Sequence, residues 1–504
     1  MSRRTLAALG AALALVTGCA PPPQSGPGLA VGGGSADERT GDGGDRDAEA
    51  GPPPWLAPTT DTDWRPCAGG RGGQGVSCAS ITAPRSDGGS GEVAVKLARA
   101  SAPDTPPDAP PLVVVAGPGR AVDELAARLV ASGDGLLPAH PVVVVGHRGE
   151  GVTPDTCLTS RDRAPFDALG TAGTDPASGD VRAGLTTATL PCLDALSGAE
   201  LDYGAAGAAR DLETVRTRWG VPGLALFGLG DGAGTAMRYA AAHPEAVVSL
   251  TLDSTPPLGG SQEDAGRAAA EGTDAALRQW AEACNRPECG AADPTARVDG
   301  VRRALEAARR PGAPVPPQRL LAVLRSALAD VSGASEPSAA GGDAVLAELA
   351  GGTPGRESLR SARELGRHAL GWIAGCTDLP ARVPTSRIAE LDAEWSSTAP
   401  VSGALTAAGL AACSTWPVPE ASPLSPRPDV PVLVLGTAVD PSAGPDPARA
   451  TADALHRAGV RTTPTVTWHA PGRDAVLHSR CARDAVAGFL ADPRSAAESA
   501  ACPS

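Results

Sequence analysis

The sequence predicts an α/β protein with a mostly parallel central sheet, helices on both faces of that sheet and a helical insertion. Short apolar runs alternate with amphipathic segments along most of the 504-residue chain. The apolar runs are rich in Val and Leu at successive positions, as expected of strands that are buried on both sides in a parallel sheet. Between about residues 256 and 400 this strand signal disappears, and a composition rich in Ala, Arg, Glu and Leu predicts helices.

Residues 1–18 have the pattern of a bacterial lipoprotein signal peptide. Arg3 and Arg4 precede an apolar run, Leu6–Val16, that is too short for a stable transmembrane helix. The run ends just before Cys19, in a sequence that resembles the lipobox, where the cysteine is lipidated. A plain signal peptide followed by a chance cysteine is the alternative. We therefore expect an exported chain, anchored through Cys19 to the membrane lipid on the outer face of the cell membrane.

Residues 19–60 consist mainly of Pro, Gly, Asp and Ala and predict a disordered tether. We divide the rest into a first core segment (61–255), a helical cap (256–400) and a second core segment (401–504). The expected strands are Glu92–Arg99, Leu112–Ala116, Pro141–Gly146, Leu224–Gly228, Val247–Leu252, Val432–Gly436 and Thr463–Trp468. The expected core helices are 121–131, 205–219, 233–242, 446–458 and 480–490. We expect the cap to cover the carboxyl edge of the sheet, where ligands bind in such folds.

Ten cysteines remain when Cys19 is set aside, an even number that predicts disulfides in an exported chain. Their order suggests five local pairs, although ten cysteines permit many other connectivities. The suggested pairs are Cys67–Cys78, Cys157–Cys192, Cys284–Cys289, Cys376–Cys413 and Cys481–Cys502. A zinc site is the rival interpretation, but the chain has no CxxC motif and no histidine at ligand spacing. We expect no metal and no cofactor.

The charge of the chain bears on its partners. A net charge of −14, without a long basic stretch, argues against nucleic acid as the main partner.

A strand, a glycine-rich turn and a helix follow one another at residues 224–243, which predicts a nucleophile elbow. Such an elbow needs small residues two positions before and two positions after the nucleophile, and Gly228 and Gly232 supply them. The residue between them is Gly230, at the position where a serine hydrolase has its serine.

Several further segments resemble secreted α/β-hydrolases of the tripeptidyl aminopeptidase and proline iminopeptidase type, over most of residues 64–504. The matching segments are Trp64 to Cys67, Ala116-Gly117-Pro118-Gly119, Arg148-Gly149-Glu150-Gly151, Asp211 with its helix, Asp440-Pro441, Gly472-Arg473 and Cys413 to Pro417. The resemblance implies an α/β-hydrolase fold and an aminopeptidase-like activity. It also implies that Asp440 is the triad acid, that position 473 holds the triad base, and that Gly117 and Asp231 flank the oxyanion hole.

The sequence departs from that family at the residues that carry its chemistry. Gly230 replaces the serine and Arg473 replaces the histidine, so the triad is not intact. Acyl transfer through an enzyme nucleophile needs that nucleophile beside a base, and arginine stays protonated at any relevant pH. The oxyanion loop also begins with Ala116, and Gly146 replaces an aspartate ahead of Arg148.

Three residues are less suitable substitutes for the lost groups. Asp231 could act as the nucleophile if the turn were shifted by one residue, but bulky Leu229 would then occupy a position that needs a small residue. His469 and His478 lie near Arg473 in the sequence and could replace the base. Histidines at the end of a strand or on the surface are the simpler interpretation of both.

We expect Arg473 to pair with Asp440 through a charge-assisted hydrogen bond, in place of the lost Asp–His bond. The resulting hypothesis is a surface-anchored pseudo-hydrolase that binds a peptide or another cell-envelope ligand without cutting it. An active exported aminopeptidase that releases N-terminal residues or short peptides is the alternative, and a purely structural envelope protein is a third. Asp231 and Asp440 suggest an amine-bearing ligand, but solvated or ion-paired carboxylates are the simpler interpretation.

Overall fold

The computed structural model describes residues 55–60, 62–68, 75–85, 91–102, 104–106, 108–132, 139–151, 153–284, 293–331, 341–419, 429–494 and 499–504. The signal peptide, most of the tether, Cys19 and Cys289 lie outside the described residues.

A single sheet runs through the core. Its strands are β1 (Arg65–Pro66), β2 (Val76–Pro84), β3 (Glu92–Ala100), β4 (Leu112–Val115), β5 (Val142–Val145), β6 (Leu224–Leu229), β7 (Val247–Asp253), β8 (Val432–Asp440), β9 (Gly444–Pro445), β10 (Thr465–Pro471) and β11 (Ala500–Cys502). They follow the order β1-β2-β3-β5-β4-β6-β7-β8-β10-β11, and β9 pairs with β8. Along this order, neighbouring strands from β5 to β11 are parallel. The pairs β1–β2, β2–β3, β3–β5 and β8–β9 are antiparallel. The mostly parallel sheet of the prediction is confirmed.

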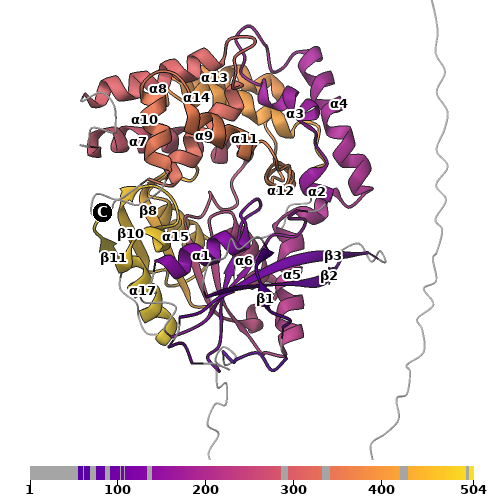
Figure 1. The fold of residues 1–504 in the computed structure, drawn as a ribbon, viewed down its shortest axis with the longest axis vertical. Coiled ribbons are helices and arrows are strands. Elements are labelled where there is room, and N and C mark those ends of the chain that lie inside the picture. Colours follow the sequence, from indigo (N-terminus) through magenta and orange to yellow (C-terminus); the bar gives the residue numbers. More distant parts are fainter. Residues whose placement is uncertain are drawn as a thin grey trace, which may run out of the picture. The chain divides into compact units, whose positions relative to one another are not determined.

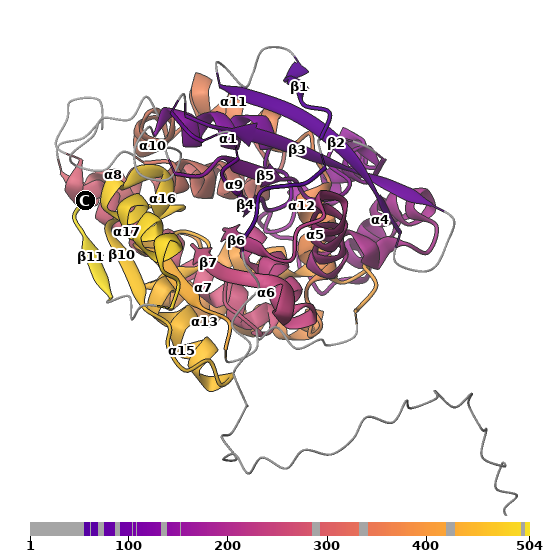
Figure 2. The same ribbon diagram turned by 90° about the horizontal axis from the view of Figure 1, so that it is seen from below.

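Helices cover both faces of the sheet, as predicted (Figure 2). The core helices are α1 (Val122–Ala131), α2 (Thr153–Thr156), α3 (Ser160–Asp167), α4 (Gly179–Leu196), α5 (Ala205–Trp219), α6 (Gly232–Ala242), α15 (Pro447–Arg457), α16 (Ala475–His478) and α17 (Arg480–Ala491), with short 3₁₀ turns at Glu200–Tyr203 and Pro244–Ala246. The five expected core helices are present, with ends within one residue of the prediction. Strand β2 was not predicted, because Ser and Thr interrupt its apolar residues on a half-exposed hairpin.

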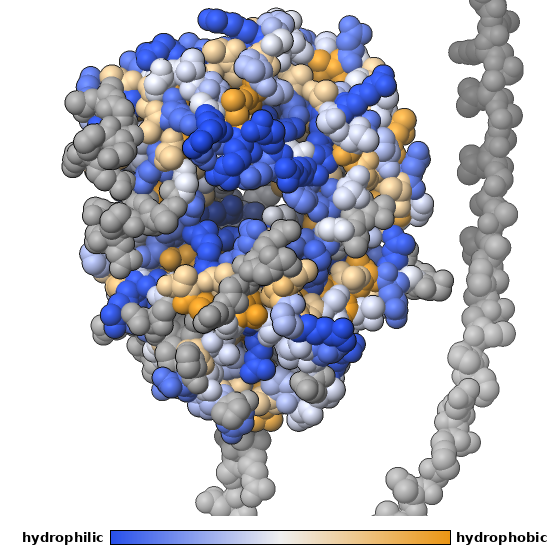
Figure 3. Space-filling view, viewed as in Figure 1, coloured by the Kyte–Doolittle hydropathy of each residue, from blue (hydrophilic) through white to orange (hydrophobic). Residues whose placement is uncertain are grey.

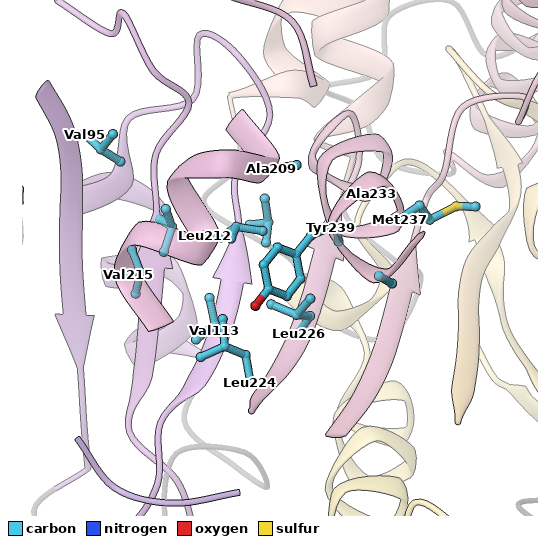
Figure 4. Packing of buried hydrophobic residues seen from close by; sticks show 14 of the residues in the cluster. Val95, Val113, Ala209, Leu212, Val215, Leu224, Leu226, Ala233, Met237 and Tyr239 are labelled. Carbon is cyan, nitrogen blue, oxygen red and sulfur yellow. The ribbon is translucent and has the colours of Figure 1, made fainter. Parts of the chain in front are cut away.

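The strands feed two separate cores because successive side chains point to opposite faces of the sheet. Val113 and Leu226 belong to the cluster that packs on α5, α6 and α15, and Figure 4 shows them beside Leu212 and Tyr239. Their strand neighbours, including Phe227, join the cluster on α1, α16 and α17. The central strands are therefore buried on both sides, which explains their continuous runs of Val and Leu.

The chain between β7 and β8 forms the helical region that lies over one end of the sheet (Figure 1). Its helices are α7 (Gln262–Ala283), α8 (Pro294–Ala308), α9 (Pro317–Ala329), α10 (Gly342–Ala350), α11 (Arg356–Leu365), α12 (Leu370–Thr377), α13 (Ile388–Thr398) and α14 (Gly403–Gly409), with 3₁₀ turns at Thr385–Arg387 and Leu410–Cys413. No strand occurs in the described part of residues 256–400. The packing continues past residue 400, because α14 packs against α7 and α13.

Disulfides join the ends of several loops. The described residues contain four of the pairs suggested by sequence order: Cys67–Cys78, Cys157–Cys192, Cys376–Cys413 and Cys481–Cys502. Cys284 is also disulfide-bonded, and its predicted partner Cys289 lies outside the described residues. Disulfides of this kind persist in oxidising compartments.

Candidate functional site

The turn between β6 and α6 has the geometry of a nucleophile elbow. Gly230 has a φ of +58°, in the left-handed region that favours glycine. A Cβ atom at Gly228 would lie 2.5 Å from the Ala233 Cα, and one at Gly232 would lie 2.0 Å from the Val115 carbonyl oxygen. Both flanking positions therefore require glycine, and the apex of the turn is residue 230.

Asp231 occupies a different place from the one that a nucleophile would need. Its φ of −64° and ψ of −19° are right-handed helical values, and it is the N-cap residue of α6. Its side chain is 53% exposed. The left-handed residue of the turn is Gly230, so the geometry matches the elbow register in which Gly230 is the apex.

We expect Gly232→Ala to lower the free energy of unfolding by about 2 kcal/mol or more, because the new methyl group would collide with backbone that cannot move aside cheaply. The matched control is Gly371→Ala in α12, where an added Cβ has no neighbour within 4 Å. That control should change stability by less than about 1 kcal/mol. Urea unfolding of both variants measures the difference, and equal stability of the two would show that the elbow is not this tightly packed.

The loop after β10 brings Arg473 to the elbow. The Arg473 backbone N–H donates to the Ala329 carbonyl oxygen in α9 at 3.1 Å. The preceding Gly472 donates its N–H to the Val439 carbonyl oxygen at 3.0 Å, which ties the loop to β8. Arg473 is therefore fixed between the sheet and the helical region, because its own backbone bonds to α9.

Two residues at the end of β7 clamp the same loop. The buried Asp253 carboxylate accepts hydrogen bonds from the backbone N–H groups of Ala475 at 3.2 Å and Val476 at 2.9 Å. The Ser254 hydroxyl accepts from the Asp474 N–H at 2.7 Å. Burial raises the pKa of Asp253 to about 7. This clamp was not predicted from the sequence, although an aspartate directly after the predicted strand Val247–Leu252 is a signal for it.

The guanidinium of Arg473 fills the space beside the apex. A Cβ atom at Gly230 would lie 3.3 Å from Cζ, Nε and Nη2 of Arg473, and these are its three nearest atoms. The Nη2 atom donates to Asp231 Oδ1 at 3.3 Å. A cation therefore stands where the nucleophile of a hydrolase would project its hydroxyl.

Arg473 also faces Asp440, at the end of β8. The Nε–Oδ2 distance is 3.6 Å, which makes an ion pair, but neither atom has a hydrogen-bond partner among the described residues. The expected charge-assisted hydrogen bond is therefore corrected to a looser ion pair. The other oxygen, Oδ1 of Asp440, accepts from the backbone N–H groups of Ser442 at 2.7 Å and Ala443 at 3.0 Å, which hold the carboxylate in place.

Burial raises the pKa of Asp440 to about 6, against the opposing effect of Arg473. A folded-state pKa above the unfolded value stabilises the protein at low pH, and this contribution disappears as the pH rises through about 6. We expect the stability advantage of wild type over Asp440→Asn to fall by on the order of 2–3 kcal/mol between pH 4 and pH 7. Denaturant unfolding of both proteins across that range measures it. An advantage that is constant or grows with pH would contradict the assignment.

The loop after β4 lies against the elbow on its other side. A Cβ atom at Gly117 would lie 2.9 Å from the Asp231 Cβ and 3.2 Å from the Gly232 nitrogen. The two segments expected to flank an oxyanion hole are therefore adjacent. Further along this loop, Arg120 Nη1 lies 2.5 Å from Oδ2 of the buried Asp474.

A buried ion pair joins the segment after β5 to helix α5. Arg148 donates from Nε and Nη2 to the two carboxylate oxygens of Asp211, at 2.9 and 2.6 Å. Asp202 lies 3.7 Å from Arg148 Nη1. The arginine and the Asp211 side chains are each only 1% exposed. Two motifs that lie 63 residues apart in the sequence therefore meet in a single bidentate contact.

The two histidines considered as substitutes for the base lie in other surroundings. His469 is exposed on β10. His478 stacks on Trp468, with ring centroids 5.2 Å apart. Burial lowers the pKa of His478. The closest neighbour of the apex is thus the Arg473 guanidinium, not an imidazole.

Within the described ranges, no group of three or more His, Cys, Asp or Glu side chains is arranged to hold a metal ion. None of the described helices is both long enough and apolar enough to span a membrane.

Part of the chain matches a known protein family. Residues 399–502 match the model of a family described as TAP-like protein, within the α/β-hydrolases. The chain has the α/β-hydrolase fold, and its C-terminal segment is similar to TAP-like proteins. This part of the α/β-hydrolase includes α14, strands β8 to β11 and both Asp440 and Arg473. Comparison with the curated proteins gives no match.

Solved structures with similar folds come from several kinds of hydrolase. A proline iminopeptidase from Mycobacterium smegmatis is 16% identical, with 82% of this chain and 98% of that chain covered and a TM-score of 0.32. A thermophilic esterase from Thermogutta terrifontis is 12% identical, with 82% and 99% covered and a TM-score of 0.34. A membrane phospholipase A described as a bacterial virulence factor is 15% identical, with 85% and 89% covered and a TM-score of 0.35.

Proposed function

We propose that this α/β-hydrolase is a pseudo-hydrolase that binds a peptide or another cell-envelope ligand in its cleft and does not cut it. The proposal rests on the position of the Arg473 guanidinium. Its Cζ, Nε and Nη2 atoms would each lie 3.3 Å from a Cβ atom at Gly230. The elbow at Gly230, the aspartate at the end of β8 and the loop after β4 are arranged as in a hydrolase. The serine and the histidine of a hydrolase are replaced by Gly230 and Arg473.

Covalent hydrolysis cannot start from these groups. The apex residue has no side chain, so no hydroxyl, thiol or carboxylate projects from it. The group beside it is a guanidinium, which cannot accept a proton. Losing the serine or the histidine of such a triad costs about 10⁶-fold in rate. The neighbouring Asp231 adds a negative charge where a hydrolase would stabilise an oxyanion.

The proposed ligand would lie in a hollow between the helical region and the core (Figure 3). Figure 3 shows the surface hollowed between the helical region and the core, with hydrophilic residues around the opening. Arg473 and Asp231 stay partly accessible, at 17% and 53% of their side-chain surfaces. Ligand binding without chemistry needs only such an open site, because no reacting group has to be positioned.

An active exported aminopeptidase is the competing function, and the match to the TAP-like family favours it. The two functions separate when the purified protein is incubated with a mixture of peptides and the mixture is followed by mass spectrometry. We expect a subset of peptides to be retained by the protein on ultrafiltration, with every peptide intact. Release of N-terminal residues in proportion to protein concentration, and absent from a mock purification without this chain, would establish the aminopeptidase.

We further propose that the chain is exported and anchored through a lipid on Cys19. The lipobox-like sequence supports the anchor, and the disulfides support an oxidising compartment. Cells grown with an alkyne-labelled fatty acid should incorporate the label into wild type and not into Cys19→Ala. Equal labelling of both proteins would overturn the anchor.

A further inference from the structure

We propose that the floor of the cleft recognises a carboxylate group of its ligand and that Arg473 is the recognising residue. This inference rests on the proposed function, because it assigns the ligand chemistry of the same site. It departs from the amine-bearing ligand that the two aspartates suggested in the sequence.

Arg473 has unused hydrogen-bonding capacity. A guanidinium carries five N–H donors in a planar fork. Among the described residues, one of these donors is used, from Nη2 to Asp231 Oδ1 at 3.3 Å. The Nε atom is buried against Asp440, so the free donors are those on the two Nη atoms. A fork with two free N–H edges matches the two oxygens of a carboxylate.

The fork is also held in position before any ligand arrives. The backbone of Arg473 is bonded to Ala329, and the buried Asp440 carboxylate lies behind its Nε at 3.6 Å. Gly230 has no side chain, so this residue places no side-chain atom against the guanidinium. Pre-organisation of this kind lowers the entropic cost of binding.

Arg120 adds a second cation to the same region. Its side chain is 27% exposed, and its partner Asp474 is buried. Asp474 also stabilises the charge of Arg473 electrostatically. The carboxylates Asp440 and Asp474 thus lie behind the two accessible guanidinium groups. Since these two carboxylates are buried, Asp231 is the accessible acceptor beside Arg473, and Arg473 already donates to it.

The two aspartates are poorly placed to hold an amine. Asp440 is fully buried, with one oxygen occupied by two backbone N–H groups and the other facing Arg473. Asp231 is accessible, but Arg473 already donates to it. In the proposed complex the ligand carboxylate takes the place of Asp231 on the guanidinium, so Asp231 competes with the ligand.

The ligand carboxylate can belong to a peptide C-terminus or to a small free acid, and calorimetry distinguishes these sources. The probes are N-acetylated tripeptides that end in Ala, Leu, Phe or Lys, each as the free acid and as the C-terminal amide, together with acetate. We expect at least one free-acid peptide to bind about tenfold or more tightly than its amide. Binding of acetate as tight as that of the best peptide acid would identify a small free acid as the source. Amides that bind as well as acids, or no binding of any acid, would overturn the inference.

Two variants test the role of Arg473, and they should change the affinity for free-acid peptides in opposite directions. Arg473→Gln should weaken acid binding about tenfold or more and leave amide binding unchanged, since it removes the charged fork. Asp231→Asn removes a competing negative charge and should strengthen acid binding severalfold. The control Arg65→Gln changes an exposed arginine on β1 and should have no effect. Because Asp231 is exposed, its variant should fold, and weaker acid binding by it would refute the inference even if Arg473→Gln proved unstable.

The outcomes also separate this inference from the proposed function. If acids and amides bind equally and stay intact, the pseudo-hydrolase stands and the carboxylate assignment fails. If the peptides are cut, the pseudo-hydrolase itself fails.

Discussion

The double variant Gly230→Ser, Arg473→His is expected to react with a serine-directed fluorophosphonate probe, while each single variant stays inert. The new serine would stand at the apex of an elbow whose geometry is already in place, and the new histidine would lie between it and Asp440. A correctly placed general base contributes about 10²–10⁴-fold. We expect hydrolysis of p-nitrophenyl acetate to rise by about 10²-fold over wild type.

Further variants test whether labelling needs both the new serine and a histidine that Asp440 orients. Gly230→Ser alone would press its Cβ against the guanidinium at 3.3 Å and leave the serine without a base. Addition of Asp440→Asn to the double variant should remove most of the gain, because the histidine would lose its orienting partner. Labelling of Gly230→Ser as strong as that of the double variant would show that Arg473 does not block the site.

Arg148→Met is expected to lower the free energy of unfolding by about 3–5 kcal/mol, the largest stability effect that we expect of a single substitution. The substitution leaves Asp211 buried and without its bidentate partner, and it also removes the cation 3.7 Å from Asp202. Guanidinium chloride unfolding at neutral pH measures the loss.

The matched comparison is Asp63→Asn, which breaks the exposed pair with Arg65. Exposed ion pairs contribute about 0–1 kcal/mol, so this variant should unfold close to wild type. A loss of less than about 1 kcal/mol for Arg148→Met would mean that the buried pair does not hold the motif segments together.

Local sequence rules were enough to predict the elbow and the central strands. Gly228 and Gly232 are required by backbone contacts that any elbow makes, so their spacing around Gly230 identified the apex. The Val- and Leu-rich runs identified strands buried on both faces, and the order of the cysteines gave the four described disulfides.

Contacts between distant segments could not be predicted in the same way. The sequence placed Arg473 near Asp440 through a resemblance, but it could not show that backbone N–H groups occupy one Asp440 oxygen and leave the other as an ion pair. The Ala329 carbonyl that fixes Arg473 comes from the helical region, 144 residues earlier (473 − 329). Contacts of this kind depend on how the helices pack on the sheet. The spacing of apolar residues along the chain does not specify that packing.

Intact-mass spectrometry of the wild-type protein after prolonged exposure to a fluorophosphonate tests the central claim most directly. An apex without a side chain, beside a permanent cation, predicts that the folded protein keeps its mass. One adduct per chain, mapped to a single serine and lost when the protein is unfolded before exposure, would mean that a working nucleophile exists in the cleft.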